Sequence, residues 1–174
     1  MTSMFPTKNW FQNLLSAAAL AALAGSAAAG PERPLLAAGG LAVQPTGAAA
    51  VELSALRAGA VAVLDPQLSS SRELLDALHR SGYQGEGLVV LVTGDAGQAE
   101  ALRRRSAALP QARWVSAAAS TVLQRLKLAG TPVVLGLDRQ QRVAWRESGL
   151  PADPLHLALR IAEWAAVPPA AERR

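Results

Sequence analysis

The sequence predicts an α/β fold in which a mixed central sheet is flanked by helices. Short apolar runs of strand length alternate with segments of helical length, the pattern of parallel strands connected by helices. A final pair of strands joined by a polar turn predicts a β-hairpin, followed by one more helix. The chain has 174 residues, of which 51% are hydrophobic, so it is long enough to bury the core of one domain.

The first helix of the domain follows a buried strand. Residues 51–53 form a short candidate strand, and the apolar run 60–64 predicts a strand buried on both faces. Ser70, with Glu73 three residues later, has the spacing of a capping box. We therefore expect a helix from Ser70 to Gly82.

The clearest strand in the sequence is the apolar run 88–92. Asp95 is placed to cap the helix that comes next, and we expect that helix to reach Leu109, where Pro110 stops it. Residues 112–116 predict a short strand.

The second half of the domain predicts a helix and a hairpin. The helix covers 120–129 and ends at Gly130. Residues 133–137 form a buried strand, 138–141 turn the chain, and 142–146 alternate in part between polar and apolar side chains, as an antiparallel edge strand does.

The last helix has a strong start signal. Asp153 is a good N-cap residue, and Pro154 stands at the first helical position. We expect this helix to reach Trp164, so that the folded domain covers 48–164 and a disordered tail covers 165–174.

The amino-terminal segment 1–29 predicts a secretory signal peptide. Lys8 supplies the positive charge, 14–24 is the apolar region, and three alanines ending at position 29 suit cleavage there. We expect a periplasmic protein, with an uncleaved membrane anchor as the alternative. Residues 30–47 are rich in glycine and proline, which predicts a linker or flexible arm.

The composition excludes several kinds of site. The chain has no cysteine, hence no disulfide, no thiolate nucleophile and no thiolate metal ligand. His79 and His156 are the only histidines, so nothing suggests a zinc centre, and we expect neither a metal nor a cofactor.

The charge pattern does not suggest a nucleic-acid partner. The net charge is +4, and the only dense basic run is 103–105, which has no aromatic residue near it in sequence. We interpret this run as a solvated helix face.

One tripeptide, in its context, indicates a family. Gly130-Thr131-Pro132 stands before a strand, an Asp-containing turn, a second strand and a terminal helix. This arrangement resembles the thioredoxin superfamily, in particular its exported TlpA-like branch, over residues 51–164. The resemblance implies a thioredoxin-like fold and a cis peptide bond between Thr131 and Pro132.

The chain departs from that family at the site of its chemistry. The family's Cys-x-x-Cys pair falls on Leu68-Ser69-Ser70-Ser71, so Leu68 and Ser71 replace the two cysteines. Gln141 also replaces the glycine usual in the hairpin turn. Disulfide exchange requires a thiolate. We therefore expect no enzyme activity of that class.

The resemblance also implies a peptide-binding groove that needs no sulfur. In this fold the backbone before the cis-proline pairs with an extended segment of the substrate. The candidate groove comprises six residues: Leu68, Ser69, Ser70, Ser71, Thr131 and Pro132. A filled or vestigial groove is the alternative.

Other candidate residues have simpler explanations. A nucleophilic serine among 69–71 needs a nearby base, but His79 lies two helical turns beyond Ser71, roughly 12 Å along the axis. Asp65 suits turn chemistry. Trp114, Trp145 and Trp164 are expected in the core or at its boundary rather than on a binding surface.

Three functions stay open from the sequence. The first is a non-redox binding or accessory protein of the bacterial cell envelope, holding another exported protein, with conjugative transfer or envelope assembly as its setting. The second is a thiol–disulfide oxidoreductase by family, inactive for lack of cysteine. The third is a purely structural domain.

Overall fold

The computed structural model describes residues 41–46, 48–106 and 109–166. The predicted signal peptide, most of the predicted arm and residues 167–174 lie outside the described residues. Within the described part, no helix combines the length and the apolar character that a membrane crossing requires.

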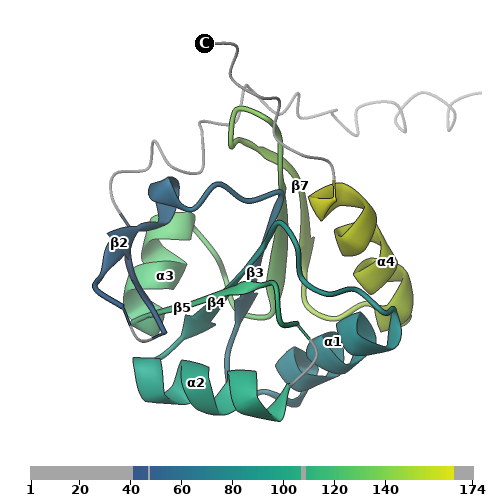
Figure 1. Cartoon of the computed structure of the whole chain (residues 1–174), viewed down its shortest axis with the longest axis horizontal. Coiled ribbons are helices and arrows are strands. Elements are labelled where there is room, and N and C mark those ends of the chain that lie inside the picture. The colour runs from purple at the N-terminus through teal and green to yellow at the C-terminus, as the bar shows by residue number, and fades with distance from the viewer. Residues whose placement is uncertain (1–40, 47, 107–108, 167–174) are drawn as a thin grey trace, which may run out of the picture. The chain divides into compact units, whose positions relative to one another are not determined.

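The described residues contain one sheet of seven strands in the order β2-β1-β5-β4-β3-β6-β7 (Figure 1). The central strands β3, β4 and β5 are parallel, and β6 pairs antiparallel with β3. The β6–β7 hairpin and the β1–β2 pair close the two edges with antiparallel strands. The strands are β1 (Ala42–Pro45), β2 (Val51–Glu52), β3 (Ala60–Leu64), β4 (Leu88–Thr93), β5 (Arg113–Ala117), β6 (Val133–Leu137) and β7 (Val143–Ser148).

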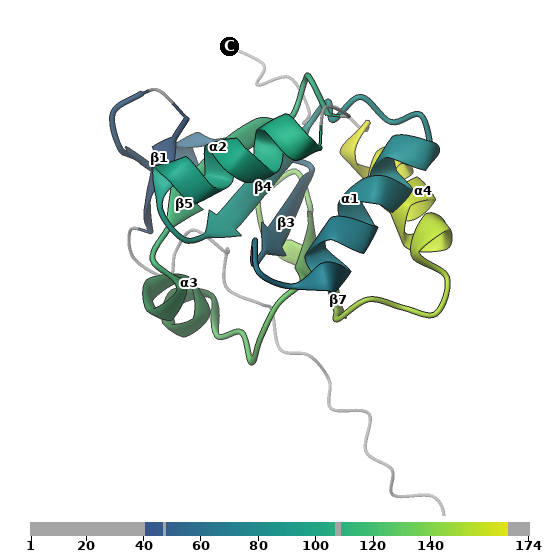
Figure 2. The same cartoon turned by 90° about the horizontal axis from the view of Figure 1, so that it is seen from below.

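Helices cover both faces of this sheet, which confirms the predicted fold class. Figure 2 shows α1, α2 and α4 on one side and α3 on the other. The short 3-10 helix η1 packs on the α3 side. The helices are η1 (Leu53–Ala55), α1 (Ser69–Arg80), α2 (Ala96–Arg105), α3 (Ala119–Leu126) and α4 (Pro154–Ala165).

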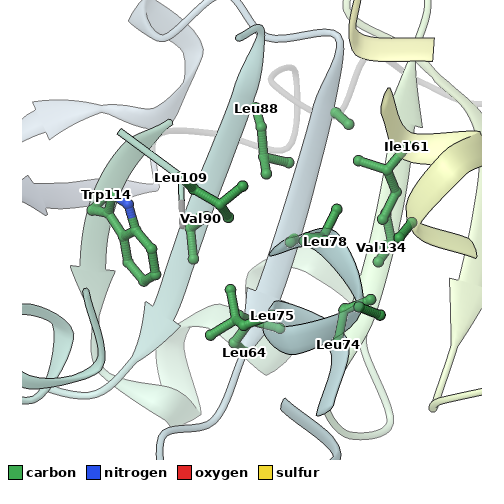
Figure 3. Packing of buried hydrophobic residues seen from close by; sticks show 14 of the residues in the cluster. Leu64, Leu74, Leu75, Leu78, Leu88, Val90, Leu109, Trp114, Val134 and Ile161 are labelled. Atoms are coloured by element: carbon green, nitrogen blue, oxygen red, sulfur yellow. The ribbon is translucent and has the colours of Figure 1, made fainter. Parts of the chain in front are cut away.

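The sheet separates two apolar cores. On the α1 and α4 side, Leu74, Leu75 and Leu78 of α1 meet side chains of the central strands (Figure 3). Every residue of β3 and β4 is buried, as the unbroken apolar runs in the sequence predict. Full burial of a Val or Leu side chain contributes about 1.5–3 kcal/mol, so these two strands anchor the fold.

Two predicted helix caps are confirmed. The carboxylate of Asp95 accepts the main-chain N–H of Gln98, and the Gln98 side chain accepts the N–H of Asp95 in return. Asp153 accepts the N–H groups of Leu155 and His156 at the start of α4. Both residues satisfy amide groups that a helix start leaves without partners.

The predicted cap of α1 is wrong. The helix begins at Ser69, its N-cap residue is Leu68, and no side chain caps it. Ser70 and Glu73 therefore do not form a capping box. The nearby hydroxyl of Ser71 instead accepts a hydrogen bond from the loop before the helix.

Two helices end earlier than predicted. α2 ends at Arg105 rather than Leu109. α3 ends at Leu126, because Lys127 takes the left-handed conformation with φ of 51° and closes the helix. Gly130 is therefore not the terminator of α3.

The sheet also begins earlier than predicted. β1 lies inside segment 30–47, for which the glycine and proline content predicted an arm. Val43 is buried in β1, and Gln44 and Pro45 pair with β5. The predicted strand at 51–53 is confirmed in part as β2, with Leu53 beginning η1.

Candidate functional site

The loop between β3 and α1 is closed by the main chain of one residue, Asp65. Its N–H donates to Oγ of Ser71 at 3.1 Å, and its C=O accepts the N–H of Leu68 at 3.2 Å. Its side chain accepts the N–H of Gln67 at 2.8 Å. Asp65 therefore serves the turn, as the sequence predicted.

The two positions that the resemblance assigns to cysteine differ in exposure. Leu68 is 39% exposed, whereas Ser71 is fully buried. Between them, Ser69 is exposed and Ser70 is half-buried. The loop thus presents an apolar side chain to solvent and keeps the second position inside.

The peptide bond between Thr131 and Pro132 is cis, as the resemblance implied. These two residues lead directly into β6, whose first residue, Val133, lies opposite Val63 of β3. Since β3 continues into the loop at Asp65, the register places the loop and the cis-proline at the same end of strands β3 and β6.

The main chain of Thr131 has no hydrogen-bond partner among the described residues. In the β3–β6 ladder, hydrogen-bonded pairs recur at every second residue, and the N–H of Leu137 donates to the C=O of Gly59 at 2.8 Å. The next such pair beyond Val63 and Val133 would join Asp65 to Thr131. The N–H and C=O of Asp65 are both hydrogen-bonded within its own loop. As a result, no hydrogen bond involves Thr131 in the part of the chain that the structure describes.

The serines of the loop have no catalytic environment. Ser71 is buried and its hydroxyl is occupied by the Asp65 amide. His79, the candidate base, is exposed near the far end of α1. No group of three or more His, Asp or Glu side chains suited to a metal ion occurs among residues 41–46, 48–106 and 109–166.

The basic run of α2 is a solvated face, as predicted. Arg103, Arg104 and Arg105 are exposed, and the first two form ion pairs with Glu100 at 2.8 and 2.7 Å. Hydrogen bonds from these arginines lower the pKa of Glu100 to about 2.

The three tryptophans of the domain have different environments. Trp114 is buried in the core, and Trp145 is half-buried over Gly136. Trp164 is 36% exposed and meets Trp145 edge-on, with ring centroids 6.1 Å apart. The prediction of core or boundary roles fits Trp114 and Trp145.

Trp164 also lines a cavity that the sequence analysis missed. This basal pocket has a volume of about 310 Å³ and lies where β3 begins, at the opposite end of that strand from the cis-proline. Only the tryptophan near the chain end could have indicated it. Its lining residues are Ala58, Gly59, Leu137, Asp138, Arg139, Gln141 and Trp164.

Gln141 shapes both the hairpin turn and the basal pocket. It has φ of 59°, the left-handed conformation in which glycine is usual. Its amide pairs with Ala58 in both directions, accepting the N–H at 3.2 Å and donating to the C=O at 3.0 Å. These two hydrogen bonds offset the strain of a backbone conformation that glycine would adopt freely.

Two glycines let α4 close the same end of the sheet. A Cβ at Gly59 would lie 2.8 Å from Cα of Ala165, and one at Gly87 would lie 2.4 Å from the C=O oxygen of Ala165. The last turn of α4, which carries Trp164, therefore rests directly on main chain.

Solved structures with this architecture are numerous, although no protein-family model and no curated protein matches the sequence. The structure of DsbF from Mycobacterium tuberculosis in mixed oxidised and reduced forms has a TM-score of 0.58 at 9% identity, covering 76% of this chain and 98% of that one. A secreted M. tuberculosis disulfide oxidoreductase homologous to E. coli DsbE gives 0.56 at 13%, covering 75% and 97%.

A thiol:disulfide interchange protein DsbE from Chlorobium tepidum gives 0.53 at 18% identity, covering 74% of this chain and 94% of that one. These scores confirm the predicted architecture. The chain has a thioredoxin-like fold. The neighbours are named for disulfide chemistry. This chain has no cysteine, so it has no thiolate to attack a disulfide.

Proposed function

We propose that this chain is a non-redox binding module of the bacterial cell envelope, where it holds an extended segment of another exported protein. The segment lies in the candidate groove between Leu68–Ser71 and Thr131–Pro132. Conjugative transfer or another envelope-assembly system is the setting we propose. The observation that carries the proposal is the unpartnered main chain of Thr131.

The unpaired main chain of Thr131, at the start of β6, is a template for strand addition. Thr131 is half-buried, and its N–H and C=O have no partner in the described structure. An extended peptide supplies the complementary groups at this position without any covalent chemistry. Leaving buried amide groups unpaired costs free energy, so an incoming strand is stabilised there.

Leu68 supports the proposal with an apolar contact. It is one of four large hydrophobic side chains exposed in the described residues. Its loop follows β3 at the same end of the sheet at which Thr131 precedes β6. Main-chain pairing would provide affinity, and contact with Leu68 would favour an apolar side chain of the bound segment.

Export rests on the sequence of residues 1–29 and on the neighbours. The charged start, apolar run and small-residue site are typical of a signal peptide. One neighbour in the structural comparison is itself a secreted protein. A partner in the same compartment must therefore be an exported protein too.

Site-specific photocrosslinking tests the groove. A benzophenone amino acid replaces Leu68 in the full chain, and the control replaces Leu155, which is exposed to nearly the same extent, 38% against 39%. We expect a crosslinked exported protein from position 68 and none from position 155. Adding Thr131→Pro, which removes the free N–H, should abolish that crosslink, whereas Thr131→Ala should retain it.

The competing functions give different outcomes. A purely structural domain gives no specific adduct at position 68, or the same adducts at 68 and 155. An adduct that persists in Thr131→Pro, with the variant shown to be folded by its unfolding curve, would contradict main-chain pairing. Turnover of insulin by the cysteine-free chain would overturn the non-redox assignment.

A further inference from the structure

The basal pocket is independent of the candidate groove. Ala58 and Gly59 precede β3, whereas the groove loop follows the last residue of that strand, Leu64. The pocket volume of about 310 Å³ falls within the range of small-molecule sites.

The main chain of Ala58, Gly59 and Leu137, which line the basal pocket, is already hydrogen-bonded. Both main-chain groups of Ala58 pair with the Gln141 amide. Gly59 donates to Gly87 and accepts from Leu137, while the C=O of Leu137 accepts the indole N–H of Trp164 at 2.9 Å. A ligand therefore meets these segments as apolar walls, with no free amide or carbonyl to bind.

The polar side chains of the pocket are also occupied, with one exception. Asp138 accepts the main-chain N–H groups of Gln140 and Arg142, and its other oxygen accepts Nε of Arg142 at 2.9 Å. Although desolvation opposes them, these bonds hold the pKa of Asp138 below its usual value, so the carboxylate is charged and paired.

Arg139 is the exception. Among the described residues, its guanidinium has neither a hydrogen-bond partner nor an ion pair. Since Arg142 balances Asp138, the lining of the basal pocket carries one uncompensated positive charge. A guanidinium of this kind matches the planar, two-oxygen geometry of a carboxylate.

Trp164 supplies a fixed aromatic wall. Its N–H is committed to Leu137, so only the ring is left for a ligand. The ring is held edge-on by Trp145 at an interplanar angle of 88°, and Arg160 covers Trp145 at 4.2 Å from the ring centroid. A ring held in place loses little freedom when another ring stacks against it.

We propose that the basal pocket binds a small aromatic carboxylate. The ring of the ligand packs against Trp164 and Leu137, and its carboxylate pairs with Arg139. The apolar walls disfavour strongly polar ligands such as sugars, because Ala58, Gly59 and Leu137 offer no free main-chain group to replace their lost hydration. The proposal does not depend on the groove or on any protein partner.

Nuclear magnetic resonance of the full chain tests this site with two matched probes. The chain has four tryptophans, and Trp164→Phe identifies which indole N–H resonance belongs to Trp164. The probes are 3-phenylpropanoate and its neutral isostere 3-phenylpropanamide. We expect a saturable shift of the Trp164 resonance with the acid, and binding of the amide weaker by about tenfold.

Charge variants complete the test. Arg139→Gln should remove the preference for the acid, whereas Arg105→Gln, at an exposed arginine on α2, should leave it unchanged. The proposal is wrong if neither probe gives a saturable shift, if acid and amide bind equally well to the unaltered chain, or if Arg139→Gln keeps the preference.

Discussion

The main-chain N–H of Asp65 donates to Oγ of Ser71, 3.1 Å away, and so ties the end of β3 to the first turn of α1. Ser71→Ala deletes this acceptor at a fully buried site and leaves the Asp65 amide without a partner. We expect the free energy of unfolding to fall by about 1–3 kcal/mol, measured by urea denaturation. Ser70→Ala, at a half-buried side chain, should change it by less than about 0.5 kcal/mol. Equal effects of the two substitutions would contradict this role.

Cysteines placed at positions 68 and 71 should form a redox pair. Leu68 is exposed and Ser71 is buried, at the N-cap and first turn of a helix where thiol pKa values are lowered. We expect Leu68→Cys with Ser71→Cys to form an intramolecular disulfide on mild oxidation. Thiol titration and intact mass would detect it, with Leu68→Cys alone as the control. A double variant that keeps two free thiols under oxidant would show that the loop lacks the geometry.

Gln141 combines strain with compensation, and two substitutions separate these effects. Gln141→Ala loses both bonds to Ala58 and keeps the left-handed backbone, which costs a non-glycine residue about 1 kcal/mol. Gln141→Gly loses the same bonds but removes the strain. We therefore expect thermal unfolding of the alanine variant at a lower temperature than that of the glycine variant. The opposite order would mean that backbone strain at this position is negligible.

Gly136 gives room to Trp145. A Cβ at position 136 would lie 2.0 Å from Nε1 of that indole, which Trp164 and Arg160 hold in place. Gly136→Ala should therefore destabilise the fold by about 1–3 kcal/mol through overpacking. Gly130→Ala, where a Cβ meets nothing within 4 Å, should cost far less. Chemical denaturation of both variants checks this, and similar losses would argue against a rigid indole.

The Glu100 cluster predicts a small loss of stability in acid. Its pKa is lowered from 4.5 to about 2 by hydrogen bonds from Arg103 and Arg104. A depressed folded-state pKa stabilises the protein above the unfolded value and ceases to do so as pH falls from about 4.5 towards 2. Glu100→Gln should therefore flatten the pH dependence of unfolding in that window. An unchanged profile would show that this exposed cluster contributes nothing.

The parts of the fold that the sequence predicts best are those decided by burial and by local caps. The runs 60–64, 88–92 and 133–137 are uniformly apolar because both faces of each strand are covered. Asp95 and Asp153 act on amide groups only two or three residues away, so the local sequence already contains the interaction.

The sequence predicts poorly wherever a distant partner decides the outcome. At the start of α1, the predicted capping box is absent, and the hydroxyl of Ser71 instead accepts the main-chain N–H of Asp65 in the preceding loop. β1 depends on pairing with β5, about seventy positions further along the chain. The glycine and proline residues around β1 favour a loop, so the local sequence does not predict this strand. Likewise, the basal pocket depends on the pairing of Gln141 with Ala58, 83 residues apart, which no local pattern reveals.

For the candidate groove, the resemblance implied the residues and the cis bond, and the structure confirms the cis bond. Neither the sequence nor the resemblance gave the reason that the main chain of Thr131 is free. That reason is the engagement of both Asp65 main-chain groups within their own loop. Whether a peptide occupies the groove stays a prediction.

The contact of Gly59 and Gly87 with Ala165 offers a way to trace the basal pocket through evolution. Any side chain at either position would lift the end of α4 and displace the aromatic ring beside it. Relatives that preserve the basal pocket should therefore keep a glycine immediately before β3 and another immediately before β4, even where the residues that line the pocket have diverged.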